Sequence, residues 1–192
     1  AFEKFLNEFP PSPYAEKVSS YLVEVYMNTR SYDAALKSID RIAKPSAQIL
    51  EAKQKILFQL GTQSFANADF EQALKYLNQS IAIGQYNRQT KADAYYWCGE
   101  SYYRLNRMVE AARDFNAYLQ LTTQPNNEMY ALANYNLGYI AFHRKDYTQA
   151  SNYFQKYIQL EKGENATALA DAYNRIGDCH LHVRNFEEAK QY

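Results

Sequence analysis

The residues best suited to chemistry lie near the C-terminus, where Cys179, His180 and His182 fall within four positions. A thiolate and two imidazoles are ligands that zinc prefers in proteins. On one helix, however, successive side chains point about 100° apart, so Cys179 and His180 cannot readily bind the same ion. The sequence therefore predicts a packed cysteine with two solvated or contact histidines, and no metal site. The neighbouring acids Glu187 and Glu188 are interpreted as a solvated helix face.

Other patterns that carry chemistry are absent from the sequence. It contains no H-E-x-x-H, no C-x-x-C, no nucleophile elbow and no glycine loop that could hold a phosphate group. The two cysteines, Cys98 and Cys179, lie far apart in the sequence within helical patterns, which favours two small buried side chains over a disulfide framework. We therefore expect no enzyme, no metal and no cofactor.

Composition and charge narrow the class of partner. The chain of 192 residues is 47% hydrophobic and 22% charged, as in folded globular proteins. Lys+Arg and Asp+Glu both total 21, so the basic face of a nucleic-acid binder is not expected. No stretch approaches the roughly 20 apolar residues of a membrane span. No signal-like segment follows Ala1, so we expect any targeting sequence to lie outside this chain.

Two series of small residues, one of glycines and one of alanines, recur with the same period. A large apolar residue stands three positions before each alanine. The members are Gly61, Gly99, Gly138 and Gly177, then Ala35, Ala73, Ala111, Ala150 and Ala189. Two independent series that share one period of about 38–39 residues indicate a repeat protein.

Each repeat is predicted to be a pair of antiparallel helices joined by a short turn. In the fourth unit, helix A spans about 128–143 and helix B 147–160. A glycine on helix A should let a small alanine on helix B approach closely, so we expect Gly138 to face Ala150 and Gly99 to face Ala111. Gly84 and Gly163 are expected as left-handed caps where a helix B ends. The other A–B turns are expected near Thr29, Asn67, Asn106 and Arg184.

These motifs resemble the tetratricopeptide repeat (TPR), in which W-x2-L-G-x2-Y precedes A-x3-F. The third unit contains Tyr95-x2-Cys98-Gly99-x2-Tyr102 and then Ala111-x3-Phe115. The resemblance implies an all-α, right-handed superhelical solenoid, although the period here is longer than the TPR period of about 34 residues. We divide the chain into a partial unit at 1–13, units at 14–45, 46–85, 86–125 and 126–163, and an incomplete unit at 164–192. We interpret the chain as a piece of a longer array.

The resemblance also implies a binding surface, because the A helices of TPR arrays line a concave groove. The groove positions are Phe58, Phe65, Tyr96, Glu100, Tyr103, Arg104, Tyr135, Tyr139, Phe142, His143, Asn174, Asp178 and His182. The alternative is that these aromatic rings only fill space between neighbouring helices. Some TPR adaptors hold a terminal carboxylate with lysines and asparagines, but the corresponding positions here are Ser20, Glu24, Phe58 and Thr62, which does not support that ligand class.

A narrower resemblance concerns the compartment. Residues 5–15 and 94–103 are similar in sequence to repeats of bacterial cell-envelope TPR proteins, namely Tol-Pal-associated periplasmic coordinators and outer-membrane-assembly lipoproteins. The main hypothesis is a non-enzymatic scaffold that binds another protein in a periplasmic or envelope assembly. The alternatives are a regulatory module of a larger signalling or transcription-control protein, or an array that associates with its own copies through its end helices. The alternative location is the cytoplasm.

Overall fold

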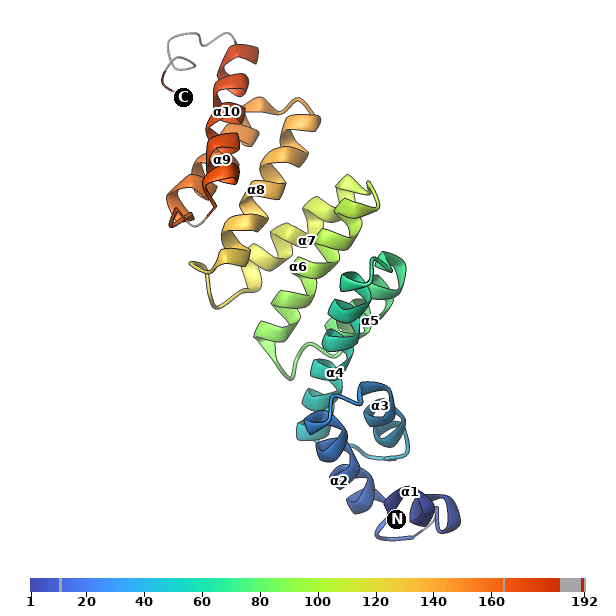
Figure 1. The fold of residues 1–192 in the computed structure, drawn as a ribbon. Coiled ribbons are helices and arrows are strands. Elements are labelled where there is room, and N and C mark those ends of the chain that lie inside the picture. The colour runs from blue at the N-terminus through green and yellow to red at the C-terminus, as the bar shows by residue number, and fades with distance from the viewer. Residues whose placement is uncertain (11, 164, 184–190, 192) are drawn as a thin grey trace. The chain divides into compact units, whose positions relative to one another are not determined.

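The computed structural model describes residues 1–10, 12–163, 165–183 and 191, which form ten helices and no strand (Figure 1). The helices are α1 (Phe2–Glu8), α2 (Ala15–Asn28), α3 (Tyr32–Asp40), α4 (Ala47–Ala66), α5 (Phe70–Ala82), α6 (Arg88–Arg104), α7 (Met108–Leu121), α8 (Glu128–His143), α9 (Tyr147–Leu160) and α10 (Ala166–His182). The chain divides into two compact parts, residues 1–101 and 102–192, with the boundary inside α6. Each part is described by itself.

Within each part, helices that follow one another in the chain pack together. In residues 1–101, α2 packs on α3 and α4 packs on α5, and α3 also contacts α4. In residues 102–192, α8 packs on α9, and α10 packs on α9 (Figure 1). The alanines of the repeat are central to this packing, because Ala35, Ala73, Ala111 and Ala150 are all 0% exposed. The all-α prediction is therefore confirmed for the described residues.

The turn between helices A and B has the same backbone form four times. Its central residue has a left-handed φ, at Arg30 (56°), Ala68 (59°), Asn106 (59°) and Lys145 (62°). The amide of the next residue donates to a carbonyl five positions earlier, as in Asp146 N to Ala141 O at 3.0 Å. This is the Schellman motif, and it satisfies carbonyls that a helix end leaves without partners. The turn predicted near Arg184 lies outside the described residues.

The same turn also begins helix B. Asp69 and Asp146 stand directly after the left-handed residue and act as N-caps, since their carboxylates accept from the amides of Gln72 and Gln149. An N-cap bond of this kind satisfies one of the first free amides of the helix. Each hairpin therefore reverses direction in three residues, which explains why its helices lie side by side.

The packing partner predicted for the repeat glycines needs a correction. A Cβ atom added to Gly138 would lie 2.8 Å from a ring carbon of Phe154, and one added to Gly61 would lie 2.6 Å from Leu77 Cγ. Both neighbours stand four residues after the expected alanine. Helical side chains lean toward the N-terminus of their helix, so Phe154 covers the level of Ala150. The glycine accommodates this large side chain, not the alanine.

The remaining glycine predictions have mixed outcomes. Gly163 has the expected left-handed φ of 83°. Gly84 does not have a left-handed backbone, so its predicted role as a cap is wrong. A Cβ there would overlap the side chain of Lys91, so Gly84 permits a close approach of the connector to α6. Gly99 and its expected partner Ala111 belong to different parts of the chain, so this pair is not described. Ala189, the expected partner of Gly177, lies outside the described residues.

Candidate functional site

Helix α8 places a stripe of aromatic rings on one face. Tyr135, Tyr139 and Phe142 follow one another at spacings of four and three residues, which puts them on the same side of a helix. All three rings are half-buried. The inner edge of the stripe packs on α9, where Tyr139 lies 5.3 Å from Phe154 and Tyr135 lies 4.9 Å from Tyr157 between ring centroids. The rings therefore have one side in the core and one side toward solvent.

The two tyrosine hydroxyls of this stripe bind the same carboxylate. Tyr135 donates to Asp171 Oδ2 at 2.8 Å, and Tyr139 donates to the same oxygen. Arg175 continues the network, with Nη1 at 2.9 Å from Asp178 Oδ2 and Nε at 3.7 Å from Asp171 Oδ1. These contacts join α8 to α10. The hydroxyls are consequently used within the chain and are not available as donors to a partner.

Burial controls the protonation of this pair. Loss of solvation is the largest cause that raises the pKa of Tyr135, and the hydrogen bond to Asp171 raises it further. The same two causes raise the pKa of Tyr139. With their pKa values raised, both hydroxyls stay neutral donors at physiological pH. The two tyrosine hydroxyls therefore connect two A helices as neutral hydrogen-bond donors.

Asp171 was not among the predicted site residues, although the repeat contains a signal for it. It stands six residues before Gly177, and Asp93 stands six residues before Gly99. An acidic residue at the same repeat position in two units indicates an A-helix position at which a carboxylate can accept hydrogen bonds. Burial is the main cause that raises the pKa of Asp93, which accepts a hydrogen bond from Gln89.

A second cluster of rings lies where α8, α9 and α10 meet near the turn. The ring of His182 stacks on Tyr147 at 4.3 Å with an angle of 7° between the planes. Phe142 contacts both rings edge-on, at 5.4 Å from Tyr147 and 6.0 Å from His182. The guanidinium of Arg175 lies 5.6 Å above Phe142. An exposed histidine thus covers a half-buried tyrosine at the edge of the surface.

Cys179 and His182 point to different surroundings. Cys179 is 1% exposed within the core, and its burial raises the pKa of the thiol to about 11. His182 is exposed and stacked on Tyr147. Among the described residues, no group of three metal-ligating side chains comes together. The two residues do not face a common ion.

The predicted groove residues of the first part lie mainly inside the fold. Tyr96 is 4% exposed, which corrects its assignment as a contact residue; its hydroxyl donates to Glu100 at 3.1 Å. Phe58 and Phe65 are half-buried, and Phe65 lies 4.9 Å from the ring of Trp97. Phe65 and Tyr96 both pack on Trp97 within the fold, as the alternative interpretation expects.

The other predicted residues are accessible. Arg104 and His143 are exposed near the ends of α6 and α8, Asn174 is exposed on α10, and Tyr103 is half-buried. In residues 102–192 the predicted positions are Tyr135, Tyr139, Phe142 and His143 of α8 and Asn174, Asp178 and His182 of α10. We call this set the α8–α10 surface. The two helices are joined by the contacts of Asp171, Arg175 and His182 with α8.

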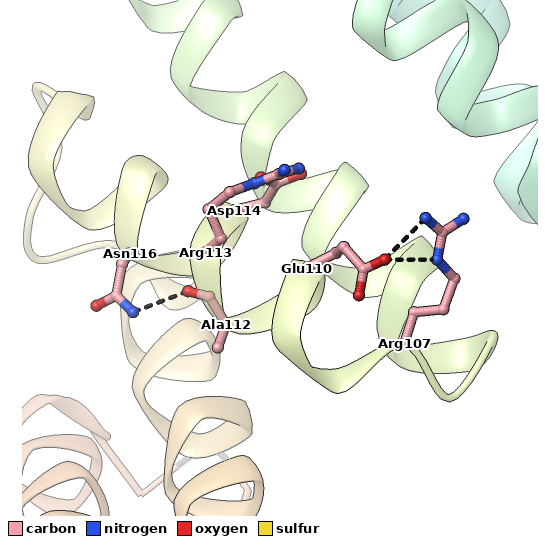
Figure 2. A network of polar contacts seen from close by, with 6 residues as sticks. All are labelled: Arg107, Glu110, Ala112, Arg113, Asp114 and Asn116. Carbon is pink, nitrogen blue, oxygen red and sulfur yellow. Dashed lines mark hydrogen bonds and ion pairs between the residues drawn. The ribbon is translucent and has the colours of Figure 1, made fainter.

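Helix α7 carries polar contacts of a different kind. Figure 2 shows Arg107 with two of its nitrogens on Glu110 Oε1, at 3.0 and 2.8 Å. Arg113 Nε lies 2.6 Å from Oδ1 of the buried Asp114, whose other oxygen has no hydrogen-bond partner in the described chain. Burial is the largest cause that raises the pKa of Asp114. These bonds join near neighbours on a B helix, so they stiffen α7 and form no convergent site.

The sequence matches two family models, both described as tetratricopeptide repeat, over residues 58–128 and over residues 131–163 and 170–192. These ranges include most of the chain. The chain is a tetratricopeptide repeat protein. The match confirms the predicted fold class, an all-α solenoid of antiparallel helix pairs.

Solved structures agree with the family. A MamA protein is 18% identical, with a TM-score of 0.60 over 94% of this chain and 89% of the other. BtubC from P. vanneervenii is 13% identical, with a TM-score of 0.61 over 99% and 83%. YrrB, described as a TPR protein with an unusual peptide-binding site, is 16% identical, with a TM-score of 0.59 over 98% and 87%. No curated protein matches the sequence.

Family membership supports a role in protein interaction. TPR proteins are in general interaction modules and not enzymes, and their arrays bind partners on extended surfaces. No described helix of this TPR protein combines the length and apolar character that crossing a bilayer requires.

Proposed function

We propose that this TPR protein is a non-enzymatic scaffold that binds a segment of a partner protein along the α8–α10 surface. The observation that supports this most directly is the half-buried aromatic stripe of α8, beside the exposed side chains His143, Asn174 and His182. Rings that are fixed from behind by a core offer contact area at little cost in rotamer entropy. YrrB supports the same class of ligand, because its structure is described as having a peptide-binding site.

The residues of this surface have different tasks in the proposal. Phe142 offers apolar area, since no polar atom of its side chain has to be satisfied. His143, Asn174 and His182 supply donors and acceptors around it. Tyr135 and Tyr139 set the shape of the surface, because their hydroxyls are held by Asp171.

We further propose that the scaffold acts in a bacterial envelope assembly. The support is the resemblance of residues 5–15 and 94–103 to envelope TPR proteins. Fractionation of cells that express the full-length gene tests this point. Recovery in the periplasmic fraction is expected, and recovery with cytoplasmic markers, or a fused catalytic or DNA-binding domain, contradicts it.

Site-directed photo-crosslinking tests the binding surface. A photoreactive phenylalanine analogue is placed at His143 or Asn174 on the A helices, and at Val109 or Thr148 on the B helices as matched exposed controls. We expect a defined crosslinked partner from the two A-helix positions only. Equal crosslinking from all four positions, or crosslinking from Val109 and Thr148 alone, refutes the proposed surface.

A further inference from the structure

An open cavity of about 500 Å³ lies in residues 1–101, beside the turn between α2 and α3. It is lined by Arg30 and Tyr32 from this turn and by Gln59, Thr62 and Gln63 from α4. The lining contains one cation and several neutral polar groups but no acidic side chain. It is separate from the α8–α10 surface, which belongs to the other part of the chain.

The repeat explains why this cavity exists. Tyr32 and Tyr147 are equivalent, since each stands three residues before the repeat alanine. Tyr147 is covered by the stacked ring of His182, which stands five residues after Gly177. Five residues after Gly61 the chain has Ala66. A methyl group cannot replace the imidazole ring, so Tyr32 has no such cover.

The same comparison explains the charge of the cavity. Gln59 and Thr62 occupy the positions that Arg175 and Asp178 occupy in α10, where the two form an ion pair at 2.9 Å. At Thr62 the acidic member is therefore missing. Arg30, the turn residue equivalent to Lys145, is therefore a cation in a cavity whose lining holds no acid.

Most donor groups of the cavity have no partner within the described chain. Arg30 forms no ion pair there, and neither its guanidinium nor the Tyr32 hydroxyl forms a hydrogen bond with a described residue. The side-chain amides of Gln59 and Gln63 likewise form none, while Thr62 donates to the carbonyl of Gln59 at 3.0 Å. A guanidinium with hydroxyl and amide donors around a hollow is suited to a carboxylate, which accepts bidentate bonds from arginine.

We propose that this cavity binds the carboxylate of an acidic side chain in a partner polypeptide, with Arg30 as the principal donor and Tyr32 as the second. This inference rests on the proposed function in one respect, that the ligand is a protein segment. It assigns a second contact point to the scaffold, at the tip of the first helix pair, and gives the charge of what binds there. Because the cavity is open, the interaction weakens as salt increases.

Fluorescence anisotropy with the full chain tests the cavity. The probe is a labelled hexaglutamate peptide with an amidated C-terminus, and the comparison probe is labelled hexaglutamine with a free C-terminus. The variants are Arg30→Asn and the matched control Lys145→Asn, which removes the same kind of charge from the equivalent turn. Asparagine tolerates a left-handed φ, so both variants keep the turn. Circular dichroism verifies that each is folded.

We expect saturable binding of hexaglutamate that Arg30→Asn weakens by about tenfold or more, since the substitution removes the charge-assisted hydrogen bonds of the guanidinium to the carboxylate. Lys145→Asn should leave the affinity unchanged. A third variant, Ala66→His, rebuilds the cover that His182 gives Tyr147 and should weaken binding while the chain stays folded.

Four results overturn the proposal. Equal loss in both Asn variants means attraction by net charge alone, and undiminished binding to Ala66→His means that the probe lies elsewhere. Equal binding of hexaglutamine with its free C-terminus means a terminal carboxylate and not a side chain. Absence of peptide binding together with intact crosslinks from His143 and Asn174 removes only the cavity, whereas the reverse pattern removes only the α8–α10 surface.

Discussion

The substitution Gly138→Ala distinguishes the effect of helix propensity on stability from the effect of core packing. Alanine in place of glycine favours a helix interior by roughly 0.5–1 kcal/mol, so propensity alone predicts a more stable protein. The added Cβ, however, would lie 2.8, 2.9 and 2.9 Å from three ring atoms of Phe154. Contacts under 3 Å require a shift, and the Phe154 ring is 0% exposed between Tyr135 and Tyr139.

Overpacking of a closed core costs about 1–3 kcal/mol, so the packing loss exceeds the gain in propensity. We expect Gly138→Ala to lower the free energy of unfolding by about 1–2 kcal/mol, measured by urea denaturation with circular dichroism at 222 nm. In a Phe154→Leu background the ring is replaced by a smaller side chain, and the same Gly138→Ala change should become neutral or stabilising. This change of sign is the expected coupling between two residues in contact.

The reasoning is refuted if Gly138→Ala stabilises the parent protein by the full propensity gain, because the ring then does not occupy the space in front of the glycine. It is also refuted if the effect is the same in the Phe154→Leu background. Gly61→Ala offers an independent repeat of the experiment, since its added Cβ meets Leu77 at 2.6 Å.

Three further predictions concern single contacts. Ala68→Gly should raise the free energy of unfolding by up to about 1 kcal/mol, because alanine is strained at its φ of 59°. Asn106→Gly should be nearly neutral, and urea denaturation of both variants measures the difference. Tyr139→Phe should lower the free energy of unfolding by about 1 kcal/mol, because it removes the hydrogen bond to Asp171. Hydrogen exchange should become faster where α8 contacts α10, and unchanged exchange there contradicts the role of this bond. Cys179, whose thiol has its pKa raised to about 11 by burial, should resist iodoacetamide at pH 8 in the native protein and react in urea, as mass spectrometry will show; rapid native alkylation contradicts its burial.

The periodic features of this protein could be predicted from the sequence. Two residue series with one period give the helix pairs, and the motif around Gly99 and Ala111 gives the family. These features are predictable because they depend on spacing along one chain segment. The helix α8 and α9 bounds expected from the pattern, 128–143 and 147–160, agree with the structure.

The site was less predictable, because burial depends on neighbours that a helical face does not specify. Tyr96 and Tyr139 both stand on A helices, yet Tyr96 is 4% exposed and Tyr139 only half-buried. The partner of Gly138 was displaced by four residues because side chains lean along their helix. The shared acceptor Asp171 depends on two helices meeting, and the uncovered ring of Tyr32 depends on Ala66 in the next helix.

The four A–B turns share one backbone conformation but have different side chains. One left-handed φ is met by Arg30, Ala68, Asn106 and Lys145, which recur at nearly equal intervals along the sequence. None is glycine, so each tip retains a side chain. The left-handed φ costs about 1 kcal/mol at Arg30, Ala68 and Lys145 and little at Asn106, because asparagine tolerates this conformation. Each tip belongs to a different helix pair, and we expect changes at two tips to be nearly additive. The four positions are regularly spaced in the sequence, and their side chains can be exchanged one repeat at a time. At each of them a protein engineer can choose either a functional group or a glycine that relieves the left-handed strain.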